Sequence, residues 1–191
     1  MENTLHLNLS GFPGAGKTTI AKKIMEIHST IIIPKVTTRP RRPTENGGEY
    51  VFISMEEFQQ RNKNGDFIAV EPNIIDGVIH YYAIPKEKFW PEVPKTAELV
   101  LSLFGIYAKT VKEYVPKMKL GFVTYKNMEI LKERLRTRCL EDGSNFQEKM
   151  KLIEQYLQSN IQDGYDYPLY NDGTIGETLK QVETLIKKNG Y

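Results

Sequence analysis

The sequence predicts an α/β fold, a doubly wound parallel sheet built around a glycine-rich loop and carrying an inserted lobe. Two observations carry this prediction. Residues 11–19 read GFPGAGKTT, which fits the pattern G-x-x-x-x-G-K-[ST] between a strand-like and a helix-like segment. Beyond this loop, apolar strand-like runs alternate with helix-like runs to residue 189, as in a parallel sheet covered on both faces.

The core elements can be placed in chain order from their periodicity. Alternation predicts a strand over 4–10, a helix over about 17–28, and a short strand over 30–33 that Pro34 ends. Continuous apolar runs predict strands over 97–104 and 118–125, with the last strand ending in the segment 166–173. Helical spacing predicts helices over 106–114, 127–138, 147–161 and 174–189. Residues 139–146, CLEDGSNF, are expected to form a loop.

The segment 35–85 differs from the rest because it is rich in Pro, Gly, Arg and Tyr. Strands are expected over 50–54 and around 78–82. A helix is expected over 55–63, capped by Ser54 with Glu57 completing a capping box. We therefore expect one domain over 1–191, with a core of 1–34 and 86–191 and an inserted lobe over 35–85.

Length and composition limit the class of protein. A chain of 191 residues suits one domain that buries roughly 70% of its unfolded surface. Cys139 is the sole cysteine, so no intramolecular disulfide can form, which fits a reducing compartment. No targeting segment or run of about 20 apolar residues is apparent, so a cytoplasmic protein without a membrane partner is expected. The net charge of +2 does not predict nucleic-acid binding, and the oligomeric state, monomer or homodimer, stays open.

The loop at 11–19 is suited to a nucleoside triphosphate. Gly11, Gly14 and Gly16 allow backbone conformations in which successive N–H groups, Ala15 included, turn toward a phosphate. Lys17 can reach the β- and γ-phosphates, and the Thr18 hydroxyl can ligate Mg²⁺. Thr19 continues the motif into the helix. The alternative is a glycine-rich turn before a helix, but the full motif with both flanks favours ATP and Mg²⁺.

A second phosphate site is indicated by TTRPRRP, which places Arg39, Arg41 and Arg42 on a proline-rich segment. Guanidinium groups suit bidentate phosphate contacts, and prolines reduce the entropy lost when the loop is ordered. Taken alone, three arginines more often form a solvated basic loop than a phosphate site.

The order of these motifs resembles the guanylate kinases, a family of nucleoside monophosphate kinases. The segment VTTRPRRPTENGGEYVFISMEEFQQRNKNGDFI and the later HYYAIPKE resemble their acceptor-binding lobe. LKERLRTR is similar to the start of their lid, placed here at about 138–149, and LYNDG to the segment beside the donor base. The resemblance covers nearly the whole chain and implies a P-loop kinase fold.

Roles follow from the resemblance residue by residue. It implies that the acceptor phosphate is held by Arg39, Arg42, Tyr50 and Tyr82. It implies that the transferring phosphoryl group is stabilised by Lys17, Arg134, Arg138 and Lys149, and that Asn171 lies by the adenine. The alternative is that the tyrosines are ordinary strand aromatics and that the arginines form a solvated helix face, paired with Glu129 and Glu133.

The sequence departs from the family at the positions that read guanine. Ala69 stands where a glutamate is usual, and Glu71 or Asp76 could serve instead. Ser102 and Phe104 stand where the sheet strand usually ends in two aspartates, and Ile84 replaces a small polar residue. Phosphate recognition is therefore expected to be kept, and guanine recognition to be altered.

Three classes of function remain after these departures. The first is ATP-dependent phosphoryl transfer to a nucleoside monophosphate, with GMP or dGMP as first guess and another or modified monophosphate, or ribose bisphosphate, as alternatives. The second is a non-catalytic guanylate-kinase-like binding module, as in membrane-associated scaffold proteins. Such modules typically lose the phosphate loop, which is intact here. An ATPase-like switch is a third and weaker option.

Overall fold

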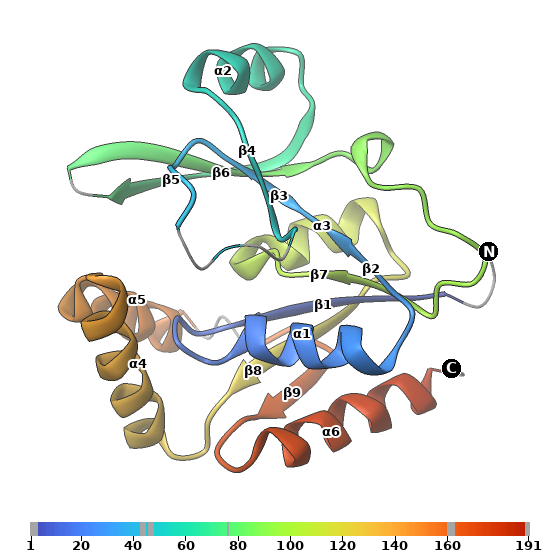
Figure 1. The fold of residues 1–191 in the computed structure, drawn as a ribbon, viewed down its shortest axis with the longest axis vertical. Helices are drawn as coiled ribbons and strands as arrows, with labels where there is room; N and C mark the ends of the chain where they lie inside the picture. The colour runs from blue at the N-terminus through green and yellow to red at the C-terminus, as the bar shows by residue number, and fades with distance from the viewer. Residues whose placement is uncertain (1–3, 43–44, 46–47, 76, 160–162, 190–191) are drawn as a thin grey trace.

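The computed structural model describes residues 4–42, 45, 48–75, 77–159 and 163–189. Its core is a five-stranded sheet in which all neighbouring strands run parallel. In spatial order the strands are β2 (Thr30–Ile33), β7 (Leu99–Ser102), β1 (Leu5–Gly11), β8 (Lys119–Thr124) and β9 (Tyr167–Tyr170). The strand order reverses beside β1, so the loop after β1 lies where open parallel sheets bind ligands. The predicted doubly wound sheet is confirmed (Figure 1).

Helices cover both faces of this sheet. Leu5, Leu7 and Leu9 point to the face packed against α1 (Lys17–Ile27), α4 (Met128–Asp142) and α6 (Ile175–Lys188). Val100 and Leu120 point to the other face, where α3 (Ala108–Tyr114) packs. The polar positions of β1, which made the strand look half-exposed, are buried as well. Among the described residues, no helix is both long and apolar enough to span a membrane.

The inserted lobe forms a sheet of its own, with strand order β4–β3–β6–β5. The bounds are β3 (Lys35–Thr37), β4 (Tyr50–Phe52), β5 (Phe67–Ile75) and β6 (Val78–Pro85). The strands β4 and β6 were expected, whereas β3 and β5 were not. Pro72 lies within β5, and the sheet tolerates it because β5 is an edge strand.

The helix α2 (Met55–Lys63) covers one face of the lobe sheet, at the top of Figure 1. Phe58 stacks on Phe67 and Tyr81, with ring centroids 5.5 and 4.6 Å apart. Ser54 caps the helix as predicted, accepting a 3.0 Å hydrogen bond from the N–H of Glu57. The second half of the predicted capping box is not formed, and the Glu57 carboxylate instead lies 3.8 Å from Arg61. This apolar face holds the lobe together, and α2 leaves the opposite face of the sheet uncovered.

The prediction of a loop over 139–146 is wrong for residues 139–142. The helix α4 continues to Asp142, and α5 (Phe146–Gln158) starts three residues after Gly143 begins the turn. Cys139 follows Leu135 by four residues and is buried with it in the core, which extends the helix by one turn. Gly143, at φ 69°, then ends it in the left-handed conformation.

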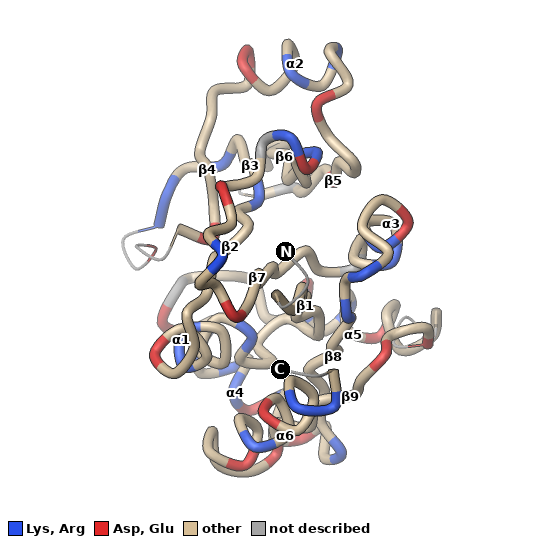
Figure 2. Tube along the Cα trace, turned by 90° about the vertical axis from the view of Figure 1, so that its right-hand side faces the viewer, with Lys and Arg blue, Asp and Glu red and all other residues tan. Residues whose placement is uncertain are grey.

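Other boundaries differ less. The strand expected over 97–104 is limited to β7. Phe104 belongs to the connection after β7, which continues into the 3₁₀ turn Gly105–Tyr107. A second 3₁₀ turn, Glu87–Phe89, follows β6. Basic and acidic positions are interspersed over both the lobe and the core, consistent with the small net charge (Figure 2).

Candidate active site

A cleft of about 650 Å³ lies between the phosphate loop, the lobe and the helices α4 and α5. Fifteen of the sixteen predicted site residues line it. They are Gly11, Gly14, Ala15, Gly16, Lys17, Thr18, Thr19, Arg39, Arg42, Tyr50, Glu71, Tyr82, Arg134, Arg138 and Lys149. The exception is Asn171, which is buried beneath the loop.

The loop after β1 has the conformation that its glycines were predicted to allow. Gly11 lies at φ 142°, and a Cβ there would stand 2.3 Å from the carbonyl oxygen of Val123. Gly16 lies at φ 87°, and a Cβ there would stand 2.7 Å from Asn171 Nδ2. No side chain caps α1 at Gly16 and its first turn has no acidic residue, so the positive end of the helix dipole is directed at the cleft.

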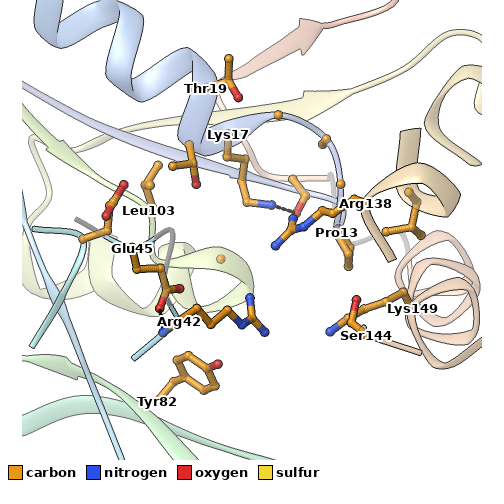
Figure 3. Close-up of a pocket in the computed structure, with 18 of the residues that line it drawn as sticks. Pro13, Lys17, Thr19, Arg42, Glu45, Tyr82, Leu103, Arg138, Ser144 and Lys149 are labelled. Carbon is orange, nitrogen blue, oxygen red and sulfur yellow. Dashed lines mark hydrogen bonds between the residues drawn. The ribbon is translucent and has the colours of Figure 1, made fainter. Parts of the chain in front are cut away.

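Lys17 is held over the loop and is poised for an anion. Its Nζ donates to the carbonyl oxygens of Gly11 and Phe12 at 3.0 and 2.8 Å. Burial, with smaller contributions from the charges of Lys35 and Arg138, lowers the pKa of Lys17 to about 7. Figure 3 shows the tips of Lys17 and Arg138 close together in the cleft. Such a cluster of cations favours a polyphosphate between them.

Asn171 supports the loop from β9. Its Nδ2 donates to the Ala15 carbonyl at 2.9 Å, and its Oδ1 accepts from the Thr178 hydroxyl at 2.9 Å. Arg134 joins the same group of side chains, donating to Tyr125 Oη at 2.8 Å and to the Asn171 carbonyl at 3.1 Å. The place of Asn171 beside an adenine stays a prediction, while these contacts give it a structural role that its sequence position did not indicate.

The wall of the cleft opposite the phosphate loop is one face of the lobe sheet. Lys35 on β3 is paired with Tyr50 on β4, and Tyr82 on β6 is paired with both Thr37 on β3 and Glu71 on β5. Because side chains alternate along a strand, these residues share the face opposite α2. The strand pairing thus brings together residues far apart in the sequence.

Arg39 is buried and its guanidinium is occupied by protein groups. It forms a bidentate ion pair with Glu45, with Nη1 2.7 Å from Oε2, and its Nε donates to Tyr82 Oη at 2.7 Å. Arg42 donates its backbone N–H to the same carboxylate at 3.0 Å, while its guanidinium extends into the open space of Figure 3. Arg42 is therefore better placed than Arg39 for a direct phosphate contact. Glu45 was not identified from the sequence because nothing local links it to Arg39.

The positions where the sequence departs from the guanylate kinases are closed to ligand. Ile84 and Phe104 are 2% exposed in one apolar cluster, and Ala69 packs against it. Ser102 is buried and donates to Asn8 Oδ1 at 3.0 Å. These replacements form the floor between lobe and core.

Glu71 reaches the cleft from the same strand. It lies two residues beyond Ala69 on β5, hence on the same face, and it lines the cleft. Burial raises the pKa of Glu71, and the positive charge of Lys35 partly offsets the effect. Asp76, the other candidate, lies outside the described residues.

Several lining residues were not predicted. Lys35 belongs to the short β3 strand, and its pairing with Tyr50 is the signal that would have revealed it. The rest come from the phosphate loop, α1, the lobe, the connection after β7, and the helices α4 and α5 with the turn between them. They are Pro13, Lys22, Glu45, Glu49, Asn73, Leu103, Gly105, Leu135, Glu141, Ser144, Leu152 and Tyr156.

This fold and site define a P-loop nucleotide-binding protein whose phosphate loop faces a separate lobe that carries arginine and tyrosine side chains. Residues 4–189 match the family model described as guanylate kinase. The chain therefore belongs to the guanylate kinase family of nucleoside monophosphate kinases.

Individual relatives agree with this assignment. The chain is 34% identical to a guanylate kinase of Helicobacter pylori over 95% of its own length and 85% of the relative's. It is 31% identical to one of Clostridium perfringens over 97% and 87%. It also resembles in fold the crystal structure of guanylate kinase from Anaplasma phagocytophilum, with a TM-score of 0.67, 23% identity, and coverage of 97% and 85%.

Proposed function

We propose that the protein transfers the γ-phosphoryl group of ATP to GMP or dGMP. One observation carries the proposal: a single cleft contains the phosphate loop on one wall and Arg42, Tyr50, Tyr82 and Glu71 on the other. ATP binds at the loop and at the start of α1. The acceptor binds with its phosphate at Arg42 and the two tyrosines, and with its base toward Glu71.

The reaction requires positioning and charge compensation rather than a dedicated nucleophile. An oxygen of the acceptor phosphate attacks the γ-phosphorus, the bond to the β-γ bridging oxygen breaks, and ADP leaves. Lys17, Arg138 and Lys149 compensate the negative charge on the transferring group. The acceptor lobe and the lid, which line the same cleft, exclude water when both substrates are bound.

The donor set fits Mg²⁺ that arrives with ATP. Thr18 lines the cleft, and among the described residues no group of three His, Cys, Asp or Glu side chains is arranged to hold a metal. Thr18, phosphate oxygens and water would therefore hold Mg²⁺, which would supply neutralisation of the phosphate charge. Asn171 contributes to ATP binding indirectly, because its side chain supports the loop that holds the phosphates.

A second candidate is a kinase of another phosphorylated acceptor. It is favoured by the apolar residues Ala69, Ile84 and Phe104, which replace the polar groups expected to read guanine. A non-catalytic binding module has less support, because the phosphate loop and its cation cluster are retained.

The deciding experiment is ADP release from ATP and Mg²⁺ with a panel of acceptors: GMP, dGMP, IMP, AMP, CMP, UMP, dTMP and phosphorylated ribose. Selective turnover of GMP and dGMP supports the proposal. Selective turnover of another acceptor supports the second candidate, and a folded protein without turnover supports the module.

A further inference from the structure

Lys35 is a cation in the acceptor half of the cleft to which neither the motifs nor the comparisons assign a role. It lies on β3 directly opposite Tyr50, and Val36 beside it is buried on the other face. Its Nζ lies 5.4 Å from the ring centroid of Tyr50 and 5.5 Å from that of Tyr82. The ammonium group is therefore held over the two aromatic rings, on the face that lines the cleft.

Lys35 and Glu71 flank the same strand from opposite sides. β6 pairs with β3 on one side and with β5 on the other, and Tyr82 on β6 is in register with Glu71. The two charges interact, because the charge of Lys35 acts to lower the pKa of Glu71 against the effect of burial. The cleft face thus presents a cation and an anion on either side of one tyrosine.

This pair has a definite hydrogen-bonding pattern. An ammonium group offers three donors and no acceptor, and a carboxylate offers acceptors only. Guanine presents O6 and N7 as acceptors, where lysine and arginine are the common partners, and its N1–H and N2 amino group are donors. Adenine presents an amino group in place of O6, which would face the ammonium group donor to donor.

We propose that Lys35 and Glu71 together read the base of the acceptor, with Lys35 donating to O6 and N7 and Glu71 accepting from N1–H and the N2 amino group. This inference rests on the proposed function and deepens it. The pair replaces the polar groups lost at the apolar floor of Ala69, Ile84 and Phe104. A base that mismatched the pair would leave a half-buried charge without its partner.

The test is the substitution Lys35→Met, which keeps the length of the side chain and removes its donors. For GMP and IMP, which carry O6 where AMP carries an amino group, we expect kcat/KM to fall equally, by about 10- to 100-fold. For AMP we expect no loss, and the KM for ATP should not change. Lys35→Arg keeps the donors and should retain most of the preference for 6-oxo purines. Lys95→Met, at an exposed lysine outside the cleft, is the matched control.

Glu71→Gln provides the second arm, because IMP lacks the N2 amino group. This variant should lose more activity toward GMP than toward IMP. Dissociation constants for GMP, IMP and AMP, measured by calorimetry on the same variants, report the same preference where turnover is slow. An equal loss for all three nucleotides in Lys35→Met would overturn the inference and place Lys35 at the phosphate. Wild-type protein that neither binds nor phosphorylates GMP would instead overturn the proposed function itself.

Discussion

The Nδ2 atom of Asn171 donates a 2.9 Å hydrogen bond to the carbonyl oxygen of Ala15, across 156 residues of sequence. This bond ties the end of β9 to the phosphate loop. It also explains the packing around Gly16, where a Cβ would approach the same amide nitrogen to 2.7 Å.

Asn171→Ala should therefore act through the loop. It removes the support of Ala15 and the closest partner of the Thr178 hydroxyl, so we expect a loss of about 1–2 kcal/mol in the free energy of unfolding. The KM for ATP should rise, while the preference for ATP over GTP as donor should stay the same. Denaturant unfolding and donor kinetics measure both quantities. Unchanged stability with an altered ATP:GTP ratio would show that Asn171 contacts the base.

Arg42→Ala should weaken acceptor binding selectively. Its guanidinium extends into the cleft, so its loss should raise the KM for the acceptor by about 10- to 100-fold with little change in the KM for ATP. Arg41→Ala is the matched control, because Arg41 lies 4.5 Å from the ring centroid of Phe52 and does not line the cleft. If the KM for ATP rose equally in Arg42→Ala, the division between donor and acceptor sites would be wrong.

Glu45→Ala should destabilise the lobe, because it leaves the buried Arg39 without its counter-charge. Breaking a buried ion pair in this way typically costs about 3–5 kcal/mol. The Glu45 side chain is 17% exposed, so we expect a loss of about 3 kcal/mol in the free energy of unfolding. The acceptor KM should rise too, since Arg39 also binds Tyr82. A variant with wild-type stability would show that Arg39 is solvated when Glu45 is removed.

Binding of ATP should be accompanied by proton uptake. With a pKa of about 7, Lys17 is largely neutral at pH 8 in the free protein, and a polyphosphate restores its charge. Calorimetry at pH 8 in buffers of different ionisation enthalpy should show uptake of up to one proton. Lys17→Met should abolish this uptake. Uptake of the same size in both proteins would assign the proton to another group.

The pH dependence of stability should include a contribution from His28, which joins the end of α1 to α6 and to the residue before β7. Its ring nitrogens lie 2.7 Å from Glu98 and 2.6 Å from Glu183. Burial acts to lower the pKa of His28, but the hydrogen bonds to Glu183 and Glu98 outweigh it, so the net pKa is raised above 6.5. This stabilisation is fully present below pH 6.5 and is lost as the pH rises through the folded-state value.

The check is the unfolding free energy of wild type and His28→Gln, measured from pH 5 to 9. The difference between the two proteins should shrink as the pH rises. A difference independent of pH would show that only the neutral ring contributes.

The sequence predicted the parts of this structure that local patterns determine. The phosphate loop could be predicted because its motif is defined by residues at fixed, short spacing. Apolar periodicity placed most of the core strands and helices. The end of α4 was missed because CLEDG has the composition of a loop, although Cys139 continues the apolar face of the helix. Burial of Cys139 in the core therefore outweighs the local composition and extends the helix.

The rest of the site depends on pairings that no local pattern reveals. β3 has three residues, and β5 contains Pro72, so neither looked like a strand. Without those strands, Lys35 could not be placed beside Tyr50, nor Glu71 beside Tyr82. The ion pair between Arg39 and Glu45 likewise depends on how the loop folds back.

The two faces of the lobe sheet have different surroundings. Val36 and Ala83 pack against α2 on one side, and Lys35, Tyr82 and Glu71 line the cleft on the other. Substitutions at Lys35, Tyr82 and Glu71 leave the apolar packing against α2 untouched, so a lineage can exchange these three cleft-lining groups while each intermediate still folds. Selection on substrate choice and selection on folding then act on different residues of the same strands.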